Sequence, residues 1–198
     1  MNQPPRIGII GIGAMGFAMA TNLRRRGHTL HVRDIDPAAV AAAATQGIPA
    51  CDSAAALAAH SDLIAIVVVD AKQADEVLFG TEGVIHAAAR DEPLAVMICS
   101  TIAASDTERF RDRLAAQGVA LLDAPISGGP VRAAAGTMSM MLACDRALFD
   151  RFEPVLREMA GTLFFVGERV GDAARTKLST TCSPASTSSP APRRSRSG

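Results

Sequence analysis

The stretch that decides the fold is Arg6-Ile7-Gly8-Ile9-Ile10-Gly11-Ile12-Gly13-Ala14-Met15-Gly16-Phe17-Ala18-Met19-Ala20, near the start of a chain of 198 residues. An apolar run ends in three glycines, and a segment of small residues suited to a helix follows at once. A dinucleotide-binding βαβ unit requires this order of buried strand, tight turn and helix. A glycine triplet also occurs in ordinary turns, but here it stands between a strand pattern and a helix pattern. The stretch therefore predicts a nucleotide-binding turn.

Each glycine has a separate role in this prediction. Gly11 allows the sharp turn, Gly13 lets a pyrophosphate approach the backbone, and Gly16 lets the helix pack closely on the strand. The free amides at the start of the helix then face the phosphates, at the positive end of the helix dipole. The predicted cofactor contacts of the turn are Gly11, Ile12, Gly13, Ala14, Met15 and Gly16.

A carboxylate after the second predicted strand indicates which cofactor is bound. Asp34 follows residues 29–33 and lies 18 positions beyond Gly16, near the spacing of a ribose ligand. It would bond the ribose hydroxyls and repel a 2′-phosphate, and the next residue, Ile35, supplies no compensating cation. A turn or N-cap role is the alternative for Asp34, although that role suits Asp36 better. We expect NAD as the cofactor, with NADP as the alternative.

Beyond this unit, apolar strand patterns alternate with helical patterns. Such alternation predicts an α/β fold with a doubly wound, Rossmann-like, mostly parallel sheet, which we assign to residues 1–166. The predicted strands are residues 7–10, 29–33, 63–69, 94–99, 119–122, 133–141 and 162–166. The predicted helices are residues 14–26, 37–46, 54–59, 71–79, 105–117 and 146–160.

Several polar residues follow the carboxyl ends of predicted strands, where ligands bind in sheets of this type. Val69 and Asp70 follow one strand, and Ser100 and Thr101 follow another. We expect them to face the same crevice as the glycine turn.

The segment Asp123-Ala124-Pro125-Ile126-Ser127-Gly128-Gly129-Pro130 also follows a strand. Ser127, Gly128 and Gly129 would expose consecutive backbone amides and one hydroxyl, a suitable cradle for a carboxylate. A glycine turn that only leads to the next segment is the alternative interpretation.

Composition narrows the class of protein. The formal net charge is zero, so no overall field attracts nucleic acid or an anionic membrane. The cysteines form no C-x-x-C pair and the histidines have no spacing suited to a metal, so we expect reduced thiols and no metal site. No apolar run approaches the length of a membrane span, and the first six residues lack the apolar core of a signal peptide. We therefore expect a soluble cytoplasmic protein.

The combination of motifs resembles the β-hydroxyacid dehydrogenase family, which includes 3-hydroxyisobutyrate dehydrogenase, tartronate semialdehyde reductase and L-threonate dehydrogenase. The resemblance covers residues 6 to about 178, and Lys177 stands in the place of the family's catalytic lysine. The other matching stretches are residues 11–16, 19–20, 22–23, 77–80, 83–84, 100–102, 123–129 and 134–137.

This resemblance implies NAD-dependent oxidation of a small 3-hydroxy acid at its hydroxyl carbon, by full-length relatives that form homo-oligomers. The Ser127–Gly129 loop would hold the substrate carboxylate, while Ser100 and Thr101 border the nicotinamide. Lys177 would exchange a proton with the reacting oxygen, since an ammonium stabilises a developing alkoxide and its pKa falls on burial. A surface lysine is the alternative for Lys177. For the whole chain, the alternatives are a non-catalytic NAD-binding module and an enzyme similar to 6-phosphogluconate dehydrogenase.

The chain departs from the family pattern around and after this lysine. Ala173 stands where the family usually has a glycine, and Thr180 and Thr181 stand where it has two asparagines. Residues 179–198 are rich in Ser, Pro and Arg with no apolar period, which predicts disorder. In the neighbouring reading frame their codons allow an amphipathic helix that contains the asparagine pair. Our hypothesis is a frameshift after Leu178: residues 167–178 begin an interdomain helix, and the family's all-helical C-terminal domain is missing, which would leave NAD binding but little turnover.

Overall fold

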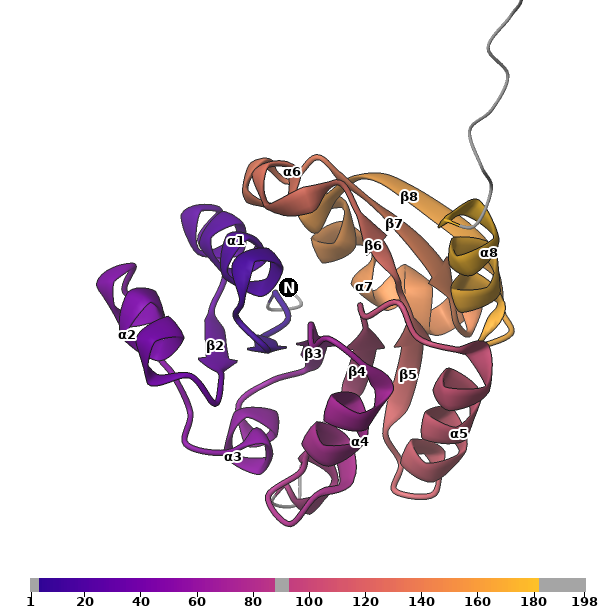
Figure 1. The fold of residues 1–198 in the computed structure, drawn as a ribbon, viewed down its shortest axis with the longest axis horizontal. Helices are drawn as coiled ribbons and strands as arrows, with labels where there is room; N and C mark the ends of the chain where they lie inside the picture. The colour runs from indigo at the N-terminus through magenta and orange to yellow at the C-terminus, as the bar shows by residue number, and fades with distance from the viewer. Residues whose placement is uncertain (1–3, 88–92, 182–198) are drawn as a thin grey trace, which may run out of the picture.

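The computed structural model describes residues 4–87 and 93–181, and it contains the predicted βαβ unit (Figure 1). Strand β1 (Ile7–Ile10) is fully buried, and helix α1 (Ala14–Arg25) follows it after the glycine turn. Strand β2 (Leu30–Arg33) then pairs with β1 in parallel. The apolar residues of β1 suit a strand that helices cover on both faces.

The eight strands form one sheet in the order β2-β1-β3-β4-β5-β7-β6, with β8 paired to β7. Strands β1 to β5 run parallel to one another, whereas β7 runs antiparallel to β5 and β6 and parallel to β8. The strand order changes direction at β1, and such a switch point is where open α/β sheets bind ligands. The predicted doubly wound, mostly parallel α/β fold is confirmed. The remaining strands are β3 (Leu63–Ile66), β4 (Ala95–Ile98), β5 (Ala120–Asp123), β6 (Ile126–Ser127), β7 (Met138–Ala143) and β8 (Ala160–Gly167).

Helices cover both faces of this sheet, with a hydrophobic cluster under each layer (Figure 1). Alternate side chains of the strands supply the two clusters, so Ile9 belongs to one and Ile10 to the other. The first cluster includes Leu23 of α1 and Phe152 of α7, and the second includes Phe110 of α5. The remaining helices are α2 (Pro37–Thr45), α3 (Ala54–Ala59), α4 (Ala71–Phe79), a short 3-10 turn (Val84–His86), α5 (Ala104–Ala115), α6 (Gly129–Ala135), α7 (Arg146–Met159) and α8 (Asp172–Thr181).

The segment after the Ser-Gly-Gly motif differs from the single strand that we expected over residues 133–141. Helix α6 comes first, and β7 begins only at Met138. Pro130 occupies the first turn of α6, and Gly136, with φ +69°, ends the helix in the left-handed conformation. The alanines between them favour a helix. The prediction was wrong because it assigned these small residues to the strand that follows them.

The strand predicted over residues 63–69 is shorter in the structure. Strand β3 ends at Ile66, which pairs with Ile10 at the end of β1 and with Ile98 at the end of β4. The next three residues, Val67 to Val69, leave the sheet at its carboxyl edge, and Val69 is 80% exposed. Val67 and Val68 are partly buried against the two hydrophobic clusters, so only Val69 lies fully outside the core.

Helix α8 begins within residues 167–178, where the sequence places the start of an interdomain helix. It continues for three residues past Leu178, into the part for which we expected disorder. The rest of that predicted tail, residues 182–198, lies outside the described residues.

Two further features of the described chain bear on its class. Within residues 4–87 and 93–181, no helix is long and apolar enough to cross a membrane. In the same residues, no three His, Cys, Asp or Glu side chains gather as a metal site would require.

Two imidazole rings stack against each other at the surface of the sheet's amino end. The rings of His31 in β2 and His60 have their centroids 5.2 Å apart, and Nδ1 of His31 has no hydrogen-bond partner among the described residues. Burial, with smaller contributions from His60 and Arg6, lowers the pKa of His31 below 6.5. Near that pH the folded state therefore binds fewer protons than the unfolded state. The resulting stability is present above pH 6.5 and is lost as the pH falls through the pKa of the folded state.

We therefore expect the melting temperature of the wild-type chain to fall more steeply between pH 7 and pH 5 than that of the H31N variant. The exposed His86 offers a matched control, because H86N removes an imidazole that lies outside this stack. Thermal unfolding followed by circular dichroism at several pH values measures the difference. Equal pH dependence in wild type and H31N would contradict the prediction.

Candidate functional site

The glycine turn between β1 and α1 has the close contacts that its sequence predicts. Gly11 has φ +86°, and a Cβ atom on it would lie 2.4 Å from the carbonyl oxygen of Val67. A Cβ atom on Gly16 would lie 2.0 Å from the carbonyl oxygen of Gly11. A side chain at either position would therefore force the backbone apart. A Cβ atom on Gly13 would meet no atom within 4 Å, so this glycine faces open space.

The amino end of α1 has no side-chain cap. Gly13 is the N-cap residue, and the first turn contains no acidic residue. The first N–H groups of a helix have no partner within the helix, and together with the helix dipole they favour an anion at this point. The turn thus fits a pyrophosphate both in its open shape and in its charge.

Asp34 connects the end of β2 to the glycine turn. Its Oδ2 accepts a hydrogen bond of 2.6 Å from the backbone N–H of Ile12, and its Oδ1 accepts one of 2.9 Å from the backbone N–H of Asp36. The carboxylate of Asp36 in turn caps α2 by accepting from the backbone N–H of Ala38. The N-cap role is therefore correct for Asp36. Asp34 braces the turn, and its contact with ribose stays a prediction.

Asp34 also borders a cleft of about 450 Å³, here called the Asp34 cleft. Glu76 and Glu82 contribute two further carboxylates to its lining. The Arg33 guanidinium, which lies in the same lining, donates to the backbone oxygen of Asp34. Carboxylates that gather around a cleft disfavour an additional phosphate group there.

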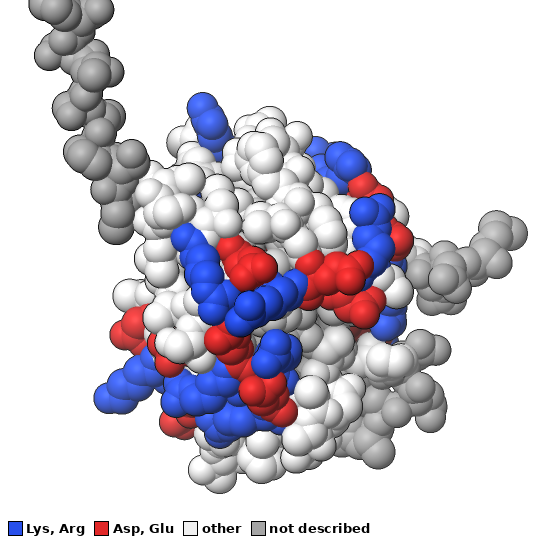
Figure 2. Space-filling model, turned by 90° about the vertical axis from the view of Figure 1, so that its right-hand side faces the viewer, with Lys and Arg blue, Asp and Glu red and all other residues white. Residues whose placement is uncertain are grey.

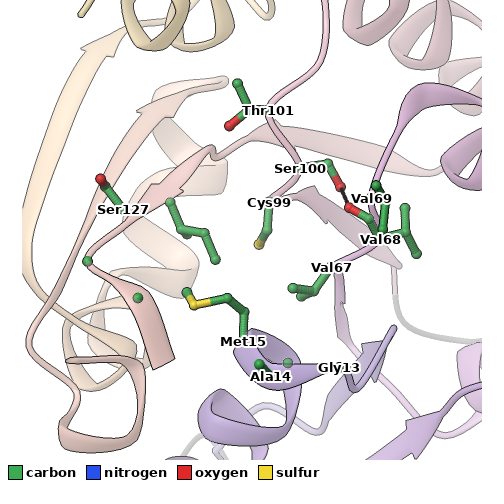
Figure 3. A pocket seen from close by; sticks show the side chains of 14 residues that line it. Gly13, Ala14, Met15, Val67, Val68, Val69, Cys99, Ser100, Thr101 and Ser127 are labelled. Atoms are coloured by element: carbon green, nitrogen blue, oxygen red, sulfur yellow. Dashed lines mark hydrogen bonds between the residues drawn. The ribbon is translucent and has the colours of Figure 1, made fainter. Parts of the chain in front are cut away.

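A second cleft, of about 470 Å³, joins the glycine turn to three other strand ends and is here called the Ser127 cleft (Figure 3). Residues from three separate predicted motifs line it: Gly13, Ala14, Met15 and Gly16; Val69, Ser100 and Thr101; and Ser127, Gly128 and Gly129. Figure 3 shows the side chains of Met15 and Cys99 pointing into this cleft. Burial raises the pKa of the Cys99 thiol to about 12, so the thiol stays protonated near neutral pH.

Two polar features shape the walls of the Ser127 cleft. The hydroxyl of Ser100 donates a hydrogen bond of 2.6 Å to the carbonyl oxygen of Val68, which ties two strand ends together (Figure 3). On the opposite side, Gly128 and Gly129 have φ +127° and +74°, conformations that favour glycine. A Cβ atom on Gly129 would meet nothing within 4 Å, so bare backbone lies open beside Ser127.

Three predicted site residues lie outside the lining of these two clefts, as far as the described part of the chain shows. Asp70 caps α4, since its carboxylate accepts a hydrogen bond of 2.8 Å from the backbone N–H of Gln73. The side chain of Ile12 is buried in the core, so only its backbone belongs to the turn. Lys177 lies on α8, where partial burial lowers its pKa.

Sequence reasoning missed two contacts of α1, one with α7 and one with α6, the helix that follows the Ser-Gly-Gly loop. The buried amide of Asn22 donates a hydrogen bond of 2.8 Å to the carbonyl oxygen of Glu158 in α7. The guanidinium of Arg25 donates one of 2.6 Å to the carbonyl oxygen of Ala134 in α6. An amide on the buried face of a helix was an available signal for Asn22. The partner of Arg25 is 109 residues away, and no local pattern indicates it.

These features define a class of protein. A doubly wound sheet, a glycine turn that leads into an uncapped helix, and a cleft at the switch point together make an NAD(P)-binding domain of the Rossmann type. The chain belongs to the family described as the NAD binding domain of 6-phosphogluconate dehydrogenase, whose model matches residues 6–167. Within it, the chain corresponds to the N-terminal NAD-binding domain of the 3-hydroxyisobutyrate dehydrogenase family.

Individual relatives agree with this assignment. The chain is 39% identical over 173 residues to the L-threonate dehydrogenase of Cupriavidus necator, covering 87% of this chain and 57% of that protein. It is 37% identical over 173 residues to the 2-hydroxy-3-oxopropionate reductase of Escherichia coli K12, covering 87% and 58%. A solved 3-hydroxyisobutyrate dehydrogenase from Salmonella typhimurium superposes with a TM-score of 0.81 at 35% identity, covering 88% of this chain and 60% of that one. The chain thus spans somewhat more than half the length of the relatives that it matches.

Proposed function

We propose that this chain binds NAD at the glycine turn, with the nicotinamide in the Ser127 cleft. The corresponding enzymes would move hydride between NAD and a small 3-hydroxy acid. One observation carries the proposal: a single cleft joins the glycine turn to the Ser-Gly-Gly loop. A nucleotide bound at the turn and a carboxylate bound at the loop would lie next to each other in this cleft. The names of the relatives, which are dehydrogenases and reductases of hydroxy acids, support the same reaction type.

The proposal gives each site residue a role. Cofactor contacts are Gly11, Ile12, Gly13, Ala14, Met15 and Gly16 for the pyrophosphate, Asp34 for the ribose, and Val69, Asp70, Ser100 and Thr101 toward the nicotinamide. Ser127, Gly128 and Gly129 bind the substrate carboxylate, and NAD, when bound, supplies the hydride acceptor. Lys177 exchanges a proton with the substrate oxygen, a role that its lowered pKa supports.

A binding module with little turnover is the second candidate function for the 198-residue chain. Lys177 does not belong to the lining of either cleft in the described residues. It also lies in the last turns of α8, beside Leu178, which is 37% exposed. A catalytic group that is displaced by ~1 Å costs on the order of 100-fold in rate. We therefore propose that this chain binds NAD but transfers hydride slowly or not at all.

A nucleotide titration and a turnover assay on the same 198-residue chain test both parts. The sequence contains no Trp and no Tyr, so the fluorescence of bound NADH is read without transfer from those residues. We expect saturable NADH binding, weaker NADPH binding, and a kcat with L-threonate or 3-hydroxyisobutyrate well below the usual range of about 1–1,000 per second. If neither NADH nor NADPH bound to the chain, the proposed function would be refuted. A kcat within the usual range would refute the low turnover and establish a working enzyme.

A further inference from the structure

Asp123 is a buried carboxylate at the end of β5, and it is only 1% exposed. Its Oδ2 accepts two backbone hydrogen bonds, of 2.9 Å from the N–H of Gly171 and of 3.0 Å from the N–H of Ala174. Both donors lie at the start of α8, 48 and 51 residues further along the chain. Asp123 therefore connects the central sheet to the beginning of this helix.

These hydrogen bonds are of a kind that stabilises a helix start. The first N–H groups of a helix have no partner within it, and a carboxylate next to them interacts favourably with the helix dipole. Burial raises the pKa of Asp123, while the N–H groups of Ala174 and Gly171 act in the opposite direction. A buried carboxylate that is held in this way is costly to leave without its donors. The contact consequently favours one fixed placement of α8.

The same residue also lies next to the Ser127 cleft. In the sheet, Asp123 is paired with Ile98 of β4 and with Ala143 of β7, so its backbone is held on both sides. Three and four residues later, Ile126 and Ser127 line the cleft. Asp123, whose backbone is fixed in the sheet, therefore precedes the loop of the cleft and also attaches α8.

Lys177 follows the attachment point by one helical turn. It comes three residues after Ala174, about 4.5 Å further along the helix axis and on the same side. Ala173 and Ala174 are buried at 0% and 3% exposure, and α8 packs on β5, β7 and β8. The stem of Lys177 therefore begins on the face of α8 that is turned toward the sheet.

Ion pairs near the surface also hold α8. Arg175 pairs with Glu108 of α5 at 2.6 Å and with Asp172 at 2.8 Å. Figure 2 views the side of the molecule where α5 and α8 lie, and it shows positive and negative side chains next to one another on this face. Exposed ion pairs contribute little to stability, so they do not replace the buried contact.

We propose that Asp123 is a positioning residue, which fixes α8 and thereby places Lys177 relative to the Ser127–Gly129 loop. The role given to Lys177 rests on the proposed function, whereas the attachment of α8 by Asp123 does not. Two substitutions separate the contribution of the hydrogen bonds of Asp123 from that of its charge. D123A removes both hydrogen bonds, and D123N keeps the size of the side chain and removes its charge. E108Q, which removes the charge that Glu108 pairs with Arg175 and Arg169 near the surface, is the matched control.

Hydrogen exchange measured by mass spectrometry shows whether the attachment is local. In D123A we expect the amides of residues 171–178 to exchange about 10-fold faster or more, with residues 7–25 unchanged, and a smaller effect in D123N. In E108Q we expect less than about a 2-fold change. Unchanged exchange in α8, or an equal rise in both segments, would overturn the proposal. If D123A does not fold, the same criteria applied to D123N decide.

The lysines provide a second signal that a general loss of stability would not produce. The chain has two lysines, Lys72 and Lys177, so dimethylated lysine NMR resolves them, with Lys72 as the internal reference. In D123A and D123N we expect the lowered pKa of Lys177 to rise toward its ordinary value, because the released side chain regains solvent. An unchanged pKa of Lys177 in both variants would also overturn the proposal. NADH titration of the same variants reports on the proposed function separately, since the glycine turn lies outside this contact.

Discussion

Replacing Gly16 with alanine is expected to abolish measurable NAD binding and to destabilise the fold. A Cβ atom at this position would lie 2.0 Å from the carbonyl oxygen of Gly11. The nearest atoms belong to the backbone of Gly11 and cannot rotate aside, so α1 must move away from the turn. Overpacking of this kind costs about 1–3 kcal/mol. The displaced helix start would no longer present its N–H groups to the phosphates, and we expect at least about a 100-fold loss of affinity, or ~2.7 kcal/mol.

Replacing Gly13 with alanine is the most informative comparison with G16A, because we expect G13A to lose affinity for the nucleotide without losing stability. Gly13 has φ −61°, which alanine adopts readily, and its Cβ atom would meet nothing within 4 Å. The fold should therefore keep its stability to within about 1 kcal/mol. The added methyl group would occupy space expected for the pyrophosphate, and we expect affinity for NADH to fall by about 10-fold or more.

Gly167 supplies a control for both variants, because a Cβ atom there also meets nothing within 4 Å and Gly167 lies at the end of β8. G167A should change neither property. Thermal unfolding and NADH titration measure the two effects. Wild-type affinity in G13A would show that the phosphates do not lie against this glycine, and wild-type stability in G16A would contradict the close packing of the turn.

Replacing Asp34 with alanine is expected to weaken NAD binding by about 10- to 100-fold and to reduce the preference for NAD over NADP. The backbone N–H of Ile12 would lose a charged acceptor at 2.6 Å, and a hydrogen bond of this kind contributes about 1.5–3 kcal/mol. Loss of the carboxylate also removes one source of repulsion against a 2′-phosphate. Glu76 and Glu82 remain in the lining of the Asp34 cleft, so we expect the preference to weaken without reversing.

The carboxylate of Asp36 provides a matched control for the D34A variant. D36A removes the same charge two residues away, but Asp36 caps α2. We therefore expect a loss of about 1 kcal/mol of stability in D36A with an unchanged ratio of NADH to NADPH affinity. If D36A alters that ratio as much as D34A, the preference comes from the general acidity of the region and the assignment of Asp34 is wrong.

The features that were predictable from the sequence are those that depend on neighbouring residues. Gly11 and Gly16 indicate the turn because a side chain at either place would clash with nearby backbone. The alternation of strand and helix patterns indicates the doubly wound sheet, and the carboxyl ends of its strands lead to Ser100 and Ser127. The strand expected at residues 133–141 shows the limit of this reasoning. The alanines between Pro130 and Gly136 favour a helix, but the prediction joined them to the apolar run of the strand that follows.

Contacts between distant segments were decided only in three dimensions. Asp34 was recognisable as a carboxylate after a strand, yet its bond to Ile12 depends on how β2 lies beside β1. Nothing around Asp123 indicates that it holds the start of α8, and nothing around Arg25 indicates its carbonyl partner. These hydrogen-bond partners are far apart in the sequence and meet only because the tertiary fold brings them together.

By itself, therefore, the sequence determined the nucleotide-binding turn, the class of the sheet and the edge at which the candidate site lies. These follow from backbone conformations and hydrophobic periods that adjacent residues impose on one another. Only the tertiary structure decided which side chains meet at that edge and what attaches the helix that carries Lys177. The physical reason is that a buried polar group must find a partner, and the packing of elements far apart in the sequence determines which partner is within reach.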